Sequence, residues 1–135
     1  YFDGFDGLFN IPLYDLIGAC DLGVFPSLYE PWGYTPMESL AVGIPAITSD
    51  LAGFGLAVPP RDTPPGGAFL LKRDEVADAD ATAALHSLLS DYLKKTPREQ
   101  LLHRMAAYTT IQKFSWDELY KNYETAYAHP APAQR

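Results

Sequence analysis

Two short apolar runs that flank one helix start constrain the fold of this chain more than any other feature. Residues 22–25 are apolar and are followed at once by Pro26, which is typical of a short buried strand. Residues 35–38, Thr-Pro-Met-Glu, have the pattern of a helix start with a Thr N-cap, and Gly43 is a natural end for that helix. Residues 45–48 predict a second strand. A strand, a helix and a strand in close succession predict parallel strands joined by a right-handed crossover.

The remaining segments extend this pattern into an α/β fold that ends in helices. A helical pattern at 12–19 precedes the first strand, 51–67 is rich in Pro and Gly and predicts a loop, and 68–71 predicts a third strand. Three further helices are expected, the first after Val76, the others with capping-box starts at Thr96 and Ser115.

This order predicts three regions along the chain. Residues 1–75 form a partial Rossmann-like parallel sheet that binds a ligand, 76–128 form C-terminal helices, and 129–135 form a frayed tail. Three strands are few for a parallel sheet, and the first residue is Tyr1 rather than Met. We therefore expect the sequence to be a piece of a longer protein.

The charge of the chain is unevenly distributed. Its 135 residues carry 10 Lys and Arg against 17 Asp and Glu, a net charge of −7. Residues 1–60 contain no Lys or Arg, so the net negative charge lies in that part. This argues against a nucleic-acid partner, which requires a basic surface, and no apolar run is long enough to predict a membrane partner.

The cysteine and histidine content excludes two further kinds of site. The single cysteine, Cys20, cannot form an intrachain disulfide, which fits a cytoplasmic protein, and we expect it to be a small buried residue. The three histidines are widely spaced and form no ligand pattern. Neither a metal nor another cofactor is expected.

The segment directly after the first predicted strand is the candidate ligand site, because open α/β sheets bind ligands where their strands end. It combines two carboxylates, two aromatic rings and a glycine: Glu30, Trp32, Gly33, Tyr34 and Glu38. An alternative is that the two aromatic rings only pack against the sheet.

This segment has the chemistry of a site for a sugar linked to a phosphate. The free N–H groups at the helix start, around Gly33, Tyr34 and Thr35, favour an anion. Glu38 lies one turn into the helix, and Glu30 precedes it. Their carboxylates can accept hydrogen bonds from sugar hydroxyls.

The same segment carries a family resemblance. Residues 21–38, which read Asp-Leu-Gly-Val-Phe-Pro-Ser-Leu-Tyr-Glu-Pro-Trp-Gly-Tyr-Thr-Pro-Met-Glu, resemble the donor-site signature of glycogen synthases, in the branch of the animal and fungal enzymes and some bacterial relatives. Residues 43–45 and 50–55 continue the resemblance. It implies part of the C-terminal domain of a two-domain GT-B fold. It also implies a retaining transfer of glucose from UDP-glucose to the non-reducing end of an α-1,4-glucan, with no obligatory metal.

The resemblance also implies a role for each candidate residue. Glu30 would contact the transferred glucose and is the catalytic candidate, and Trp32 would help to shape that pocket. The backbone N–H groups of residues 33–35 would hold the distal phosphate, and Glu38 the ribose hydroxyls. Family members stack an aromatic ring on the base near positions 13–14, where Tyr14 is the candidate here.

Several parts that the resemblance implies are missing from the sequence. The family uses an Arg and a Lys upstream to stabilise the departing diphosphate, and residues 1–60 contain neither. The acceptor domain and its histidine are absent too. We expect the isolated chain to be inactive and to need the upstream part of the same enzyme.

Two other functions stay open. The chain could be a non-catalytic nucleotide-sugar-binding remnant, or it could come from another GT-B enzyme, such as a starch synthase that uses ADP-glucose.

Residues 53–55, Gly-Phe-Gly, lack the third glycine of a dinucleotide fingerprint and are expected in a loop rather than at a helix start.

The last predicted helix carries an apolar stripe. We expect this stripe to pack in the core or between domains, and to be exposed in the isolated chain, which favours a homo-oligomer. Its residues are Trp116, Leu119, Tyr120, Tyr123 and Tyr127.

Overall fold

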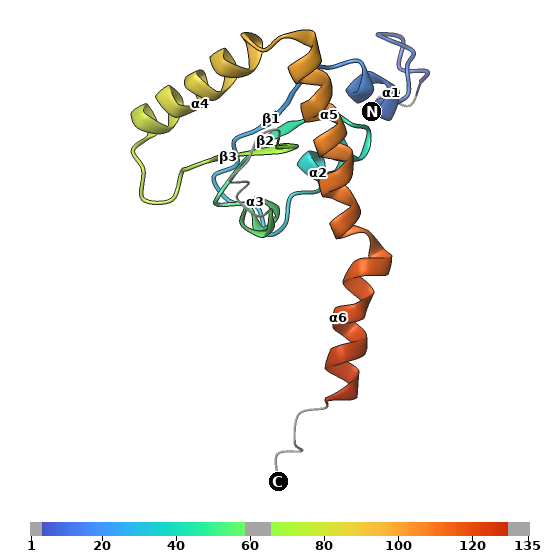
Figure 1. Ribbon diagram of the computed structural model, residues 1–135. Helices are drawn as coiled ribbons and strands as arrows, with labels where there is room; N and C mark the ends of the chain where they lie inside the picture. Colours follow the sequence, from blue (N-terminus) through green and yellow to red (C-terminus); the bar gives the residue numbers. More distant parts are fainter. Residues whose placement is uncertain (1–3, 59–65, 130–135) are drawn as a thin grey trace.

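A three-stranded parallel sheet lies at the centre of the protein (Figure 1). The computed structural model describes residues 4–58 and 66–129. Strands β1 (Gly23–Phe25), β2 (Ala46–Ser49) and β3 (Ala68–Leu71) lie side by side in that order. All four residues of β2 are buried, as befits the central strand. The predicted mixed α/β fold with a parallel sheet is confirmed.

The connection between β1 and β2 contains the predicted helix, but the helix begins differently. Helix α2 (Tyr34–Ala41) starts two residues earlier than the Thr35 N-cap predicts. Gly33 is its N-cap instead, with a φ of 112°, and no side chain caps the helix. The predicted Thr35 capping box is therefore wrong. A glycine can adopt this left-handed backbone, which a side chain disfavours.

The connection between β2 and β3 contains a short helix where the sequence predicted only loop. Helix α3 (Gly53–Ala57) starts at the Gly-Phe-Gly segment, so the expectation that this segment opens no helix is wrong. Two contacts explain the helix. The Phe54 side chain is fully buried, and a Cβ on Gly55 would collide with the backbone oxygen of Ser49. The helix places Phe54 in the core while its backbone lies tightly against the end of β2.

The other helices flank the sheet or extend away from it. Helix α1 (Leu13–Gly18) precedes the sheet, α4 (Asp78–Leu93) and α5 (Pro97–Ile111) follow it, and a short 3-10 turn η1 (Gln112–Phe114) leads into α6 (Trp116–Ala128). The capping box at Thr96 is confirmed, and Ser115 accepts a hydrogen bond from Glu118 N as an N-cap.

Helices α2, α3 and α5 meet in one core against β2. Its fully buried members are Leu40, Ala46, Phe54 and Ala107. Helix α5 comes very close to the chain before β3, since a Cβ on Gly67 would collide with the Ala107 backbone. This contact fixes α5 against the sheet.

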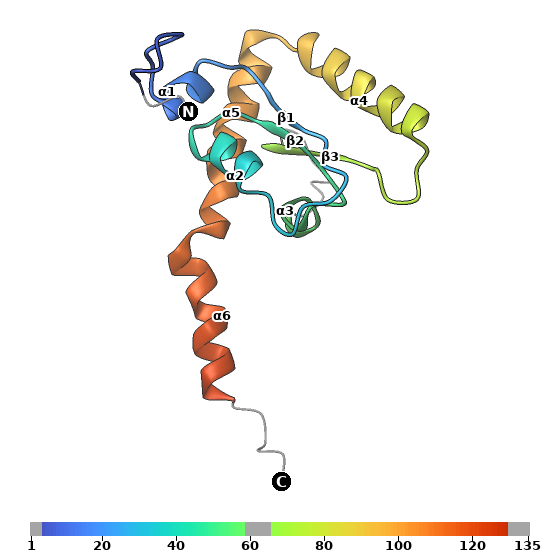
Figure 2. The same ribbon diagram turned by 180° about the vertical axis from the view of Figure 1, so that it is seen from behind.

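Helix α6 extends away from the rest of the protein in both views (Figures 1 and 2). It has no buried residue, and Trp116 and Tyr127 are 65% and 76% exposed. The predicted exposure of its aromatic stripe is confirmed for these two rings, and for Tyr120 and Tyr123. Of the predicted tail, residues 130–135 lie outside the described part of the chain.

Two further findings complete the fold. Cys20 is exposed, not buried as expected, because it follows α1, a helix that buries none of its residues. Among the described residues, no helix combines the length and apolar character needed to cross a membrane.

Candidate functional site

The candidate site lies where β1 and β2 end. Beyond the strands, the two chain segments continue side by side, with an isolated parallel bridge between Glu30 and Ala52. Glu30 N donates to Leu51 O at 3.2 Å, and Gly53 N donates to Glu30 O at 3.1 Å. The backbone of Glu30 is therefore held on both sides by the segment after β2.

The Glu30 side chain is directed at the start of helix α2. A Cβ built on Gly33 would lie 3.5 Å from both Glu30 Cδ and Glu30 Oε2. Ser27 Oγ donates a hydrogen bond to the same Oε2 at 3.0 Å. The carboxylate thus lies beside the N-cap Gly33, a buried glycine whose added Cβ would be in van der Waals contact with it.

The N-terminus of α2 provides free hydrogen-bond donors next to this carboxylate. The first N–H groups of a helix have no partner within the helix, and no side chain caps α2. Tyr34 is 71% exposed, and Thr35 is exposed as well. The arrangement can bind an anion at the N–H groups while Glu30 accepts hydrogen bonds from an attached group.

Glu38 lies one turn further along α2 and has a partner from α1. Tyr14 Oη donates to Glu38 Oε1 at 3.1 Å. As acceptor and as negative charge, the Glu38 carboxylate raises the pKa of the Tyr14 phenol. The structure brings together two candidates that are 24 residues apart in sequence.

The two aromatic candidates differ in their surroundings. The Trp32 ring contacts Phe54 and Phe114 edge-on, each with ring centroids 6.1 Å apart, and Trp32 Nε1 donates to Met37 Sδ at 2.8 Å. Trp32 therefore packs in an aromatic cluster beneath the start of α2. The packing alternative does not hold for Tyr34, which is exposed.

Asp50 is a buried carboxylate at these strand ends that the sequence reasoning did not single out. It follows β2 directly and accepts hydrogen bonds from the backbone N–H groups of Arg73, at 2.7 Å, and Asp74, at 3.1 Å. Lys72 Nζ lies 3.2 Å from its other oxygen. Burial raises the pKa of the Asp50 carboxyl, but these hydrogen bonds and the Lys72 charge outweigh burial and lower it below its usual value.

Arg73 connects the ends of two strands. Its Nη1 donates to Pro26 O at 2.9 Å, directly after β1, and its Nη2 forms an ion pair with Asp78 at 2.9 Å. Asp50 and Arg73 therefore hold the ends of all three strands together. The position of an acidic residue directly after a buried strand was the signal that could have revealed Asp50.

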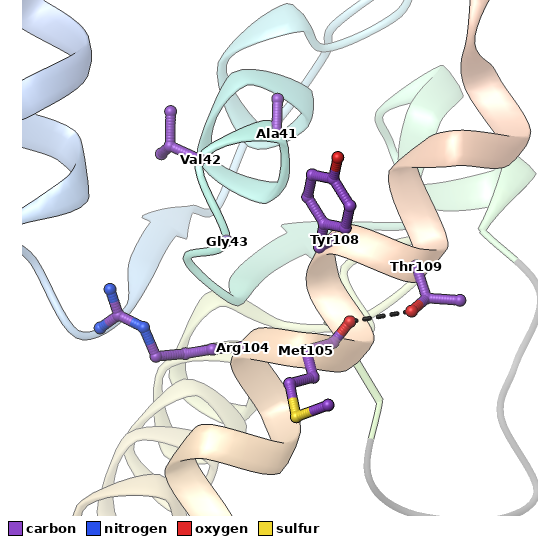
Figure 3. Close-up of a pocket in the computed structure, with 7 residues that line it drawn as sticks. All are labelled: Ala41, Val42, Gly43, Arg104, Met105, Tyr108 and Thr109. Atoms are coloured by element: carbon purple, nitrogen blue, oxygen red, sulfur yellow. Dashed lines mark hydrogen bonds between the residues drawn. The ribbon is translucent and has the colours of Figure 1, made fainter.

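An open pocket lies at the other end of α2 and contains none of the predicted site residues (Figure 3). The Arg104 guanidinium points away from Tyr108 in this view and donates to Gly18 O and Cys20 O. The pocket is lined by Ala41, Val42, Gly43, Arg104, Met105, Tyr108 and Thr109. Among residues 4–58 and 66–129, no group of three or more His, Cys, Asp or Glu side chains could hold a metal ion.

The fold and the site together define an open α/β unit, with an uncapped helix N-terminus beside a carboxylate at the ends of parallel strands. The sequence profile of the glycogen synthase family matches residues 1–131. The chain therefore belongs to the glycogen synthase family, which confirms the resemblance.

Individual relatives agree with this membership. The chain is 33% identical over 114 residues to the liver glycogen (starch) synthase of Mus musculus, an alignment that covers 83% of this chain and 16% of the relative. It is 31% identical to glycogen (starch) synthase of Caenorhabditis elegans, over 83% of this chain and 17% of the relative. It is 30% identical to glycogen (starch) synthase isoform 2 of Saccharomyces cerevisiae, an alignment that covers 83% of this chain and 16% of the relative. The chain thus spans about one sixth of the length of these relatives.

Proposed function

We propose that this chain supplies the donor-sugar side of a retaining glucosyltransferase of the glycogen synthase type. In this proposal, glucose passes from UDP-glucose to the non-reducing end of an α-1,4-glucan. Membership of the family supports the reaction class. The main support for the proposal is that the Glu30 carboxylate lies beside Gly33, the residue at the uncapped N-terminus of α2.

Each group at this convergence has one task. The N–H groups of Gly33, Tyr34 and Thr35 hold the distal phosphate, where negative charge develops as UDP departs. Glu30 accepts hydrogen bonds from the transferred glucose and orients its reacting carbon. No metal and no other cofactor takes part in this assignment.

The nucleoside lies toward α1 in the proposed site. Glu38 accepts hydrogen bonds from the ribose hydroxyls, and the ring of Tyr14 stacks on the base. The contact between these two side chains supports the assignment, because base and ribose are adjacent in a nucleotide. Trp32 shapes the pocket by supporting the start of α2 through Met37.

The proposed reaction needs groups that the described residues of this chain do not provide. Residues 1–60 hold no cation to offset the diphosphate, and the described cations nearest in sequence, Lys72 and Arg73, pair with Asp50 and Asp78. We assign the missing cations and the glucan-binding surface to the upstream part of the same enzyme, in the cytoplasm. The isolated 135 residues are then inactive. The exposed aromatic stripe of α6 is the surface for any homo-oligomer.

Turnover of two donors by the full-length protein tests this proposal. We expect incorporation of glucose from UDP-glucose into glycogen, less from ADP-glucose, and release of the new glucose by an α-1,4-specific glucosidase. Binding of UDP-glucose without any transfer would instead identify a non-catalytic remnant. A preference for ADP-glucose would identify a starch synthase type of enzyme.

A further inference from the structure

A hydrogen-bonded chain of two serines runs from the buried sheet to the Glu30 carboxylate. Ser49, the last residue of β2, is 0% exposed, and its Oγ donates to Ser27 O at 2.6 Å. Ser27 Oγ in turn donates to Glu30 Oε2 at 3.0 Å. Two side-chain hydroxyls therefore connect the central strand to the carboxylate.

The backbone around Ser27 is fixed independently of its hydroxyl. Ser27 N donates to Phe25 O at 3.0 Å, which closes a tight turn after β1. Glu30 is held by its own backbone bonds to Leu51 and Gly53. What these bonds leave free is the rotation of the Glu30 side chain, and the Ser27 hydroxyl restricts that rotation.

The Ser27 hydroxyl bonds to a side chain and not to the backbone of its turn. Such hydroxyls ordinarily bond to nearby backbone groups and stabilise the turn itself. Here the hydroxyl is directed to a carboxylate, while the Ser27 carbonyl is taken by the buried hydroxyl of Ser49. One hydrogen bond therefore restrains the Glu30 side chain, and the other restrains the turn that carries Ser27.

We propose that Ser27 is a positioning residue that orients the Glu30 carboxylate toward the donor glucose, and that Ser49 holds Ser27 in place. This inference rests on the proposed function, because it assigns the glucose to Glu30. It assigns to the Ser27 hydroxyl an effect on the contact between Glu30 and the glucose, and no effect on nucleotide binding. Placing a reacting group within a fraction of an ångström can change a rate by orders of magnitude.

Removal of the Ser27 hydroxyl in the full-length protein is the first test. In Ser27→Ala we expect kcat for transfer from UDP-glucose to fall about 10- to 100-fold, as on loss of a hydrogen bond to a charged group. Affinity for UDP, which carries no glucose, stays within about twofold of wild type. Ser27→Thr, which keeps a hydroxyl, restores most of kcat. A kcat for Ser27→Ala within about threefold of wild type, or equal losses in both variants, overturns the inference.

A pair of buried serines provides the matched control for Ser49. Ser39 is 1% exposed and, like Ser49, donates to a backbone oxygen, that of Ile44 at 3.1 Å, but its bond does not lead to Glu30. Both Ser→Ala variants should lower the thermal unfolding temperature, and only Ser49→Ala should also lower kcat. Equal kcat values in the two variants would show that Ser49 acts on stability alone.

A double-mutant comparison separates this inference from the proposed function. In a Glu30→Ala background, adding Ser27→Ala should leave the affinity for UDP-glucose unchanged, because the hydroxyl has lost the group it orients. A further loss in that background contradicts the positioning role. If wild type itself binds neither UDP nor UDP-glucose, the proposed function fails, whatever the serine variants do.

Discussion

The phenol of Tyr14 donates a hydrogen bond to Glu38 Oε1 at 3.1 Å and so joins helix α1 to helix α2. Tyr14 is 53% exposed, so part of it is accessible to a ligand while its hydroxyl is held. In the proposed site, the ring stacks on the base and Glu38 binds the ribose. The hydrogen bond sets the spacing between these two contacts.

Shortening Tyr14 should weaken nucleotide binding through loss of the ring. We expect Tyr14→Ala to raise the Kd for UDP about tenfold, the usual size of a lost stacking contact with a base. Tyr14→Phe keeps the ring and should stay within about threefold of wild type. Calorimetric titration of the full-length protein with UDP measures both.

Tyr108 provides the control for this comparison. It is 58% exposed, similar to Tyr14, and lies on α5 beside the pocket at the far end of α2. Tyr108→Ala should leave the Kd for UDP unchanged. A similar Kd for Tyr14→Ala and wild type would remove Tyr14 from the nucleotide site.

Substituting the two glycines at opposite ends of α2 distinguishes an effect of backbone strain on stability from an effect on turnover. Gly33 and Gly43 both have a left-handed backbone, with φ of 112° and 77°, but only a Cβ on Gly33 would lie beside Glu30. Each Gly→Ala change should lower the free energy of unfolding by about 1 kcal/mol through backbone strain. Only Gly33→Ala should also reduce turnover of UDP-glucose, by about tenfold, because its methyl group lies beside the Glu30 carboxylate.

Urea unfolding and steady-state kinetics on the same two proteins test this difference. Loss of turnover in both variants would mean that strain in α2, and not the space beside Gly33, limits the reaction.

Asp50 predicts a pH dependence of stability. Its pKa in the folded protein lies below the usual value near 3.9, so its contribution is present above about pH 4 and is lost as pH falls through the folded-state pKa. We expect Asp50→Asn to lower the free energy of unfolding by about 2 kcal/mol at pH 7, since its two backbone donors and Lys72 lose a charged partner.

Urea unfolding between pH 7 and pH 3 measures this contribution. The difference between wild type and Asp50→Asn should shrink as the pH falls below about 4, because the wild-type carboxyl becomes protonated. A difference that stays constant down to pH 3 would mean that the charge of Asp50 does not stabilise the fold.

Local patterns in the sequence were sufficient to predict the strands and the longer helices. The apolar runs at β1 and β2 and the capping box at Thr96 depend only on neighbouring residues, so they could be read directly. Helix α3 could not, because what favours it is the burial of Phe54 and the close approach of Gly55 to Ser49. Those contacts join segments that only the folded chain brings together.

The site divides in the same way. Glu30, Gly33 and Glu38 were found from the helix start and the family signature, which lie within one continuous segment. The hydrogen bond from Ser49 to Ser27 joins the end of β2 to the turn after β1, and the two residues are 22 positions apart, so no spacing rule could indicate it.

In the proposed donor site, Glu30 contacts the donor glucose while Glu38 contacts the nucleoside. The most direct test measures the Kd values of UDP and UDP-glucose for Glu30→Gln and Glu38→Gln in the full-length protein. We expect Glu38→Gln to weaken both ligands about tenfold, and Glu30→Gln to weaken UDP-glucose while leaving UDP unchanged. Unchanged affinities for both ligands in both variants would contradict this assignment of the donor site.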